Sequence, residues 1–236
     1  MNPFAALLNL IIPRECHICG ARLLADEAFV CSPCVGRLPA TGYASYWANK
    51  GTLNADLNPM EQRFAGQLPL DHACAPFFYT RDSSLASLIH DFKYRGFSRL
   101  ATTLGALGAE TLKHSGLFDG IDILLPIPIH WTKRLKRGYN QSELIARGVS
   151  QTMDIPLGNH LVASRPHRTQ TSLSAEQRIA NTKDIFRIRR PLELEGKSIM
   201  LVDDICTTGA TLLSAGEAVA RAVPSARISI FTLGVV

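Results

Sequence analysis

Apolar residues along the chain follow two spacings, that of amphipathic helices and that of buried strands. Leu85, Leu88, Ile89 and Phe92 recur at helical spacing, so a helix is predicted over 84–94. Continuous apolar runs predict buried strands over 121–125, 199–202 and 227–235, with an edge strand over 77–79 and further helices over 99–113, 141–151, 174–182 and 212–223. Strands that alternate with helices predict an α/β fold built on a doubly wound parallel sheet.

The chain divides into three parts by the character of its sequence. Residues 1–40 hold two cysteine pairs and predict a leading helix with a small ribbon, residues 41–75 predict a connector, and residues 76–236 predict the main domain. The apolar stretch 4–12 has some character of a signal peptide, but it lacks a basic leader and runs into cysteines, which favours a short packed helix. The sequence contains no apolar run of the about 18 residues that a membrane span needs, and a cytoplasmic location is expected.

The positive charge is concentrated in two segments. The 236 residues are 46% hydrophobic and 19% charged, as in ordinary soluble proteins, and carry a formal net charge of +5. The segments 130–147 and 165–190 carry net charges of +4 and +5, which leaves −4 for the remainder. A local basic excess favours an anionic partner, for which a pyrophosphate and a nucleic acid are both candidates.

The most informative motif lies between residues 198 and 211. An apolar run ends in Asp203 and Asp204, and a short loop then opens the helix expected over 212–223; its residues are Thr207, Thr208, Gly209, Ala210 and Thr211. The N–H groups of such a loop favour a phosphate, and the acidic pair can accept hydrogen bonds from vicinal ribose hydroxyls. Ligands of open α/β sheets bind at the carboxyl ends of strands, so a ribose 5-phosphate site is predicted. A simple helix cap and turn is the alternative.

A basic loop follows the strand predicted over 121–125. Within it, Arg134 and Arg137 are candidates for binding a diphosphate, because guanidinium forks match phosphate oxygens. The alternative is a solvated basic helix end.

Four of the six cysteines form two C-x-x-C pairs, Cys16 with Cys19 and Cys31 with Cys34. Tetrahedral Zn²⁺ takes four thiolates, so the pairs predict a structural zinc ribbon. Two disulfides and redox-active dithiols are the alternatives; the first are disfavoured in the cytoplasm, and the second need a βαβ setting that this stretch lacks. His17, inside the first pair, is expected to point away from the metal. Cys206, in the phosphate loop, is either an inert side chain or a thiol of lowered pKa.

Several motifs occur in a characteristic order. After the cysteine pairs come Ile89-His-Asp-Phe-Lys-Tyr-Arg-Gly96, Arg137-Gly-Tyr-Asn-Gln141, a Thr-Gln-x-x-Leu-Ser-x-x-x-Arg-x-x-Asn-x-x-x-x-Phe pattern and the 198–211 motif. The last closely resembles the 5-phosphoribosyl-1-pyrophosphate (PRPP) motif of type I phosphoribosyltransferases. Together they resemble the ComF family (ComFC/GntX-like proteins). Many relatives carry further cysteine pairs after the first ribbon, whereas residues 41–75 here keep Cys74 alone, so no second metal site is predicted.

The resemblance implies a role for each matching residue. A type I phosphoribosyltransferase-like domain would bind PRPP with Mg²⁺, with Asp203 and Asp204 on the ribose hydroxyls and the loop from Thr207 to Thr211 around the 5-phosphate. Arg134 and Arg137 would stabilise the departing pyrophosphate, and Lys93 and Arg95 would reach toward the ligand.

The family is associated with natural competence and the use of external DNA, and two kinds of function follow from the resemblance. The first is an enzyme that transfers a phosphoribosyl group to an acceptor that the sequence does not name. The second is a non-catalytic module that binds single-stranded DNA or proteins of the uptake machinery and uses a degenerate PRPP cradle.

Overall fold

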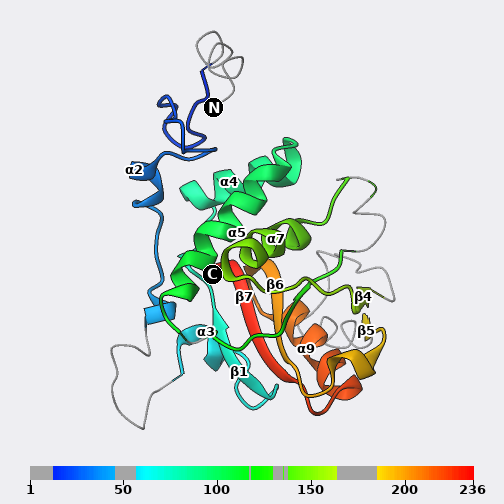
Figure 1. The fold of residues 1–236 in the computed structure, drawn as a ribbon. Coiled ribbons are helices and arrows are strands. Elements are labelled where there is room, and N and C mark those ends of the chain that lie inside the picture. The colour runs from blue at the N-terminus through cyan, green and yellow to red at the C-terminus, as the bar shows by residue number, and fades with distance from the viewer. Residues whose placement is uncertain (1–12, 46–56, 117, 130–134, 136–137, 164–184) are drawn as a thin grey trace, which may run out of the picture.

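A central parallel sheet organises the protein (Figure 1). The computed structural model describes residues 13–45, 57–116, 118–129, 135, 138–163 and 185–236. In the sheet, β1 (Leu70–Cys74) pairs with β7 (Arg227–Val235), β7 with β6 (Ser198–Cys206), and β6 with β3 (Ile123–Pro126), all parallel. The short β2 (Phe77–Phe78) pairs with the end of β7. The expected α/β fold with a parallel sheet is thus confirmed.

The sheet is wound in two directions from a point between β3 and β6. From β3, helix α7 (Gln141–Met153) leads to a parallel bridge between Leu124 and Leu157, on the side of β3 away from β6. From β6, helix α9 (Ala210–Ala222) leads the other way, to β7. Crossovers between parallel strands are right-handed as a rule, which puts helices that lead in opposite directions on opposite faces of the sheet. The strand order therefore reverses between β3 and β6, which is where open sheets bind their ligands.

Helices α5 (Ser98–Lys113) and α7 pack unusually close together. A Cβ atom placed on Gly148 of α7 would lie 2.1 Å from the carbonyl oxygen of Thr102 in α5, and one on Gly105 would lie 2.2 Å from that of Ile145. Glycine at these two positions lets the backbones touch. Helix α4 (Ser84–Tyr94) packs beside α5 and buries Leu85, Leu88, Ile89 and Phe92, as its spacing predicts (Figure 1).

Two predicted boundaries are corrected by the structure. The segment expected to be a connector contains α3 (Pro59–Gln62) and β1, a strand of the main sheet. β1 escaped prediction because it is a short edge strand in which Asp71 and His72 interrupt the apolar residues. β6 also runs on through Asp203 and Asp204 to Cys206, since it keeps pairing with β7 after β3 has ended.

Smaller elements complete the described chain. β4 (Leu161–Ala163) and β5 (Phe186–Ile188) form an antiparallel pair apart from the main sheet, and η2 (Pro191–Leu194) follows it. Near the N-terminus lie α2 (Ser32–Val35) and η1 (Tyr43–Ser45). No helix of the described ranges is both long and apolar enough to cross a bilayer. The helices expected near 4–12 and over 174–182 lie outside the described residues.

The segment that follows the cysteines runs along the edge of the sheet. Ala40 forms an antiparallel bridge with Phe77, and the N–H of Phe78 donates to the carbonyl oxygen of Pro39 over 2.7 Å. The N–H of Thr41 donates to the carbonyl oxygen of Pro76 over 2.9 Å. This segment therefore covers part of the outer edge formed by β2.

Candidate functional site

The acidic pair lies at the point where the strand order reverses. β3 ends at Pro126, opposite Val202, so Asp203 and Asp204 extend beyond the neighbouring strand on that side while β7 still supports β6 on the other. Both side chains are half-buried. The pair therefore stands at the carboxyl end of the sheet, as the sequence predicts.

Asp203 is held by the first turn of α7. The Ser142 hydroxyl donates to Asp203 Oδ1 over 2.7 Å, and the N–H of Asp204 donates to the same oxygen over 2.9 Å. Asn140 caps α7 and donates from Nδ2 to the carbonyl oxygen of Ile127 over 3.0 Å, which fixes this turn beside the end of β3. Desolvation, reinforced by the charge of Asp204, raises the pKa of Asp203 from 3.8 to about 7. Ser142 was not singled out from the sequence, because it is a common residue at a helix start.

Asp204 forms an ion pair with Lys93, which comes from the last turn of α4. Both side chains are largely shielded from water, with exposed fractions of 17% for Lys93 and 18% for Asp204, so the attraction is only partly screened. Lys93 therefore lies at the acidic pair, and its expected reach toward a ligand stays a prediction. Arg95 instead pairs with Asp91, Nη1 to Oδ1 over 3.1 Å, and its own side chain is mostly exposed.

The loop after β6 has the geometry of a tight strand-to-helix turn. Gly209 has a φ angle of 80° and stands at the N-cap of α9, where a Cβ atom would meet the buried ring of Phe64 at 3.0 Å. Within the described chain no side chain caps this helix. Arg63 donates to the carbonyl oxygens of Thr207 and Val236, which ties the loop to α3 and the last strand. Thr207 and Thr208 are exposed, so the loop offers hydroxyl and N–H groups to solvent.

The basic loop after β3 is described in part. Arg134 and Arg137 lie outside the described residues. Tyr139, which follows them, donates its hydroxyl to the carbonyl oxygen of Phe92 in α4. The end of this loop is thus joined to the helix that supplies Lys93.

The four paired cysteines lie together. The Sγ atoms of Cys16, Cys19, Cys31 and Cys34 are all within 4.8 Å of one another. The Cys19 and Cys31 sulfurs are 3.7 Å apart, too far for a disulfide of about 2.05 Å and close to the roughly 3.8 Å that four Zn–S bonds of 2.3 Å impose in a tetrahedron. The N–H groups of Ile18 and Cys31 also donate to the sulfur of Cys16, each over 3.4 Å, which suits a thiolate. The cluster therefore fits a metal ion such as zinc.

Cys206 is almost fully buried, and desolvation raises the pKa of its thiol. A thiol of raised pKa is a poor nucleophile at neutral pH. The structure thus favours the inert interpretation of this cysteine.

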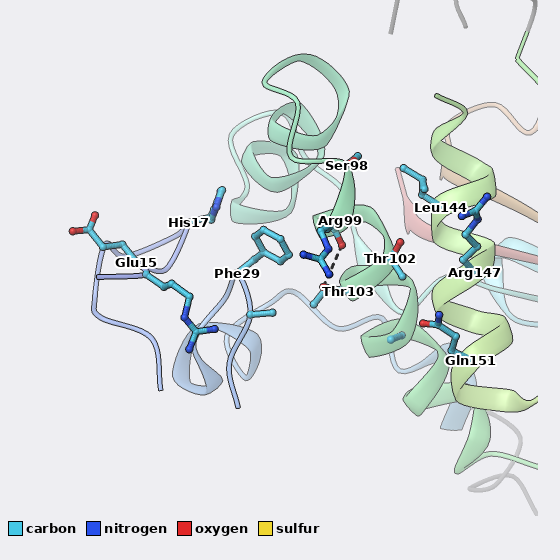
Figure 2. A pocket seen from close by; sticks show the side chains of 13 residues that line it. Glu15, His17, Phe29, Ser98, Arg99, Thr102, Thr103, Leu144, Arg147 and Gln151 are labelled. Carbon is cyan, nitrogen blue, oxygen red and sulfur yellow. Dashed lines mark hydrogen bonds between the residues drawn. The ribbon is translucent and has the colours of Figure 1, made fainter. Parts of the chain in front are cut away.

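A groove separates the segment that carries the four paired cysteines (residues 13–40, the cysteine segment) from α5 and α7 (Figure 2). Its volume is about 920 Å³, and Glu15, His17 and Phe29 line one wall while Arg99, Thr102, Thr103, Arg147 and Gln151 line the other. Arg147 pairs with Glu143 over 2.8 Å, and Arg14 donates to the carbonyl oxygens of Glu27 and Leu24. Arginines outnumber acids among the residues of this groove.

A comparison with known protein families agrees with the fold. Residues 140–233, from the start of α7 into β7, match the phosphoribosyl transferase domain family. The matched range, which holds the acidic pair and the loop after β6, is thus similar to phosphoribosyl transferase domains.

Similarity to individual proteins adds to this match. Competence protein F of Haemophilus influenzae is 32% identical over 133 residues, or 54% of this chain and 58% of that protein. The DNA utilization protein YhgH of Escherichia coli K12 is 30% identical over 141 residues, or 58% and 61%. Competence protein ComFC of Bacillus subtilis is 30% identical over 158 residues, or 66% and 61%. The chain thus spans about six tenths of the length of these relatives, and its resemblance to the ComF family is confirmed.

Proposed function

We propose that the protein binds PRPP with Mg²⁺ at the carboxyl ends of β3 and β6. The observation that carries this proposal is the acidic pair at the reversal of strand order, with Asp203 held by Ser142 and Asp204 by Lys93. In this proposal, Asp203 and Asp204 accept hydrogen bonds from the ribose hydroxyls. The 5-phosphate binds the N–H and hydroxyl groups of residues 207–211, because the start of α9 favours negative charge.

The cation is expected to arrive with the ligand. Asp204 is already balanced by Lys93, so the acidic pair is not a dedicated metal cage. Mg²⁺ keeps several waters and binds largely through substrate phosphates, so it would be held by the diphosphate and ribose oxygens. When it binds, it neutralises part of the diphosphate charge.

Transfer of the phosphoribosyl group is the enzymatic form of the proposal. The bond from the ribose to pyrophosphate breaks, an acceptor takes the ribosyl carbon, and negative charge develops on the departing pyrophosphate. Arg134 and Arg137 would stabilise that charge. The relatives named for competence and DNA utilization support a role in the use of external DNA.

The cysteine cluster has a structural role in this proposal. Residues 1–40 form a module that Zn²⁺ holds together through four thiolates. The phosphoribosyltransferase-like domain comprises residues 76–236 and, in addition, β1. The support is the geometry of the sulfurs and their hydrogen bonds.

Calorimetric titration of the zinc-loaded protein with PRPP–Mg²⁺ tests the proposal. Asp204→Asn is expected to weaken binding by about 1.5–3 kcal/mol, the usual contribution of a charge-assisted hydrogen bond, or roughly 10- to 150-fold in Kd. Loss of binding in the Asp203→Asn/Asp204→Asn double variant supports the site. Absence of binding by the folded wild type, or unchanged affinity in the double variant, overturns it.

A non-catalytic role in binding single-stranded DNA is the second candidate, and the groove beside the cysteine segment favours it (Figure 2). Arg99 and Arg147 could contact phosphates there, and Phe29 offers an aromatic ring to a base. Affinity that falls steeply with salt supports DNA binding. Arg99→Ala should then bind more weakly and with a shallower salt dependence, because it has lost one phosphate contact. Affinity for PRPP alone, with none for DNA, rejects this candidate.

A further inference from the structure

The last turn of α4 contacts three separate parts of the protein through three consecutive residues. Asp91 accepts a hydrogen bond from His17, which lies between two of the paired cysteines, with 2.8 Å between Oδ2 and Nδ1. The carbonyl oxygen of Phe92 accepts the hydroxyl of Tyr139, at the end of the basic loop. Lys93 pairs with Asp204 in the acidic pair. One helical turn therefore joins the cysteine cluster to both halves of the candidate phosphosugar site.

The contact between His17 and Asp91 is built into the interior. Asp91 is 4% exposed, and its other oxygen is bound by Arg95, so a negative charge is held there by two donors from different directions. The ring of His17 also packs edge-on against Phe97, with 4.6 Å between ring centroids, and against Phe29 at 5.6 Å. Shielded contacts of this kind fix the position of the groups that make them.

We infer that His17 is a positioning residue for the phosphosugar site, and that metal binding at the cysteines strengthens phosphosugar binding through Asp91 and Lys93. The metal would fix the turn from Cys16 to Cys19, and with it the ring of His17. His17 holds Asp91, and the same helical turn then presents Lys93 to Asp204. The inference rests on the proposed PRPP site.

Thermodynamic linkage makes this coupling reciprocal. If the bound metal raises the affinity for PRPP by some factor, PRPP must raise the affinity for the metal by the same factor. A coupling of about 5-fold or more is expected for two sites joined by a shared structural element. The effect of PRPP on the affinity for the metal can therefore be measured without any catalytic assay.

Two substitutions of His17 separate its hydrogen bond from its bulk. His17→Leu keeps an apolar side chain against Phe97 but removes the donor to Asp91, whereas His17→Asn places an amide N–H near the position of Nδ1. Both variants keep the four cysteines, so both are expected to retain one zinc per chain. His90→Asn is the matched control, because His90 precedes Asp91 on the same helix but is exposed.

The measurements are zinc content, the Kd for PRPP–Mg²⁺ by calorimetry, and the Kd for zinc by competition with a chromophoric chelator, with and without PRPP. His17→Leu is expected to raise the Kd for PRPP about 5-fold or more and to abolish the effect of PRPP on zinc affinity. His17→Asn should largely restore both, and His90→Asn should match the wild type.

Each alternative outcome has a distinct meaning. Wild-type affinity for PRPP in His17→Leu, with full zinc content, overturns the inference and leaves the PRPP site intact. Equal zinc affinity of the wild type with and without bound PRPP also overturns it. If His17→Leu loses zinc or fails to fold, the linkage in the wild type decides, because zinc affinity that rises with bound PRPP supports the inference and unchanged zinc affinity rejects it. Absence of PRPP binding in the folded wild type overturns the proposed function, and this inference with it.

Discussion

Different forces stabilise the cysteine segment and the domain built on the central parallel sheet, here called the sheet domain. The largest fully buried side chains belong to the sheet domain and its flanking helices, among them Phe64, Phe92 and Phe231. In the cysteine segment the buried residues are smaller, mainly Leu23, Val30, Leu38 and three of the cysteines. A structural zinc ion contributes roughly 10–16 kcal/mol, as much as the about 5–15 kcal/mol that stabilises a whole domain. The two regions should therefore respond to different perturbations.

The largest expected effect comes from breaking the cysteine cluster. In Cys31→Ser, residues 13–40 are expected to unfold while the sheet domain stays folded, because a core this small cannot replace a lost thiolate ligand. Limited proteolysis with mass spectrometry should find new cleavage sites confined to this segment. Cys74→Ala, which changes a buried cysteine of β1 outside the cluster, is the control and should keep its zinc. Continued protection of residues 13–40 in Cys31→Ser would contradict the prediction.

A pH change is expected to act on the sheet domain through Asp203. Its pKa is about 7 in the folded protein, against an ordinary value of 3.8. Between these values the folded state binds more protons than the unfolded state, so stability is greatest at low pH and falls as pH rises from about 4 to about 7. The loss attributable to Asp203 is at most about 4 kcal/mol.

Urea unfolding at pH 5 and pH 8 measures this effect. Asp203→Asn should show a smaller loss of stability between the two pH values than the wild type, because an amide does not titrate. Asp82→Asn, which alters an exposed carboxylate, should behave as the wild type. The same pH difference in Asp203→Asn and wild type would argue against a raised pKa.

A smaller effect is expected from separating α5 and α7. Gly148→Ala places a methyl group against the backbone of α5 and should lower the unfolding free energy of the sheet domain by about 1–3 kcal/mol. Gly36→Ala is the matched control in the cysteine segment, where the nearest atom to a new Cβ is 3.7 Å away. A denaturant midpoint for Gly148→Ala equal to that of Gly36→Ala would contradict the close helix packing.

The sequence predicted the elements with a complete apolar face. The expected helix over 84–94 and strand over 227–235 coincide with α4 and β7. β1 was missed because Asp71 and His72 break its apolar residues into runs too short to show a strand pattern. The order of residue types also predicted where the acidic pair and the Thr-Gly loop lie.

The contacts that surround the site could not be predicted in the same way. Lys93 and Arg95 were both singled out through a family resemblance, as residues that reach toward the ligand. In the structure Lys93 forms an ion pair with Asp204, and Arg95 forms one with Asp91. Ser142 contacts Asp203 across 61 positions, and His17 contacts Asp91 across 74. Local spacing carries no information about such pairs, because tertiary packing brings them together.

The strand-like contact between residues 39–41 and β2 has a consequence for solubility. This segment satisfies backbone groups of Pro76 and Phe78 at the margin of the sheet, and it follows directly on the cysteine cluster. An uncovered sheet margin is a template on which another chain can add a strand. Phe78, already 43% exposed, would then lie beside unpaired amides. A chain made without its metal would therefore lose more than the folded cysteine segment. It would also lose the cover over the sheet edge at β2, and with it a protection against self-association.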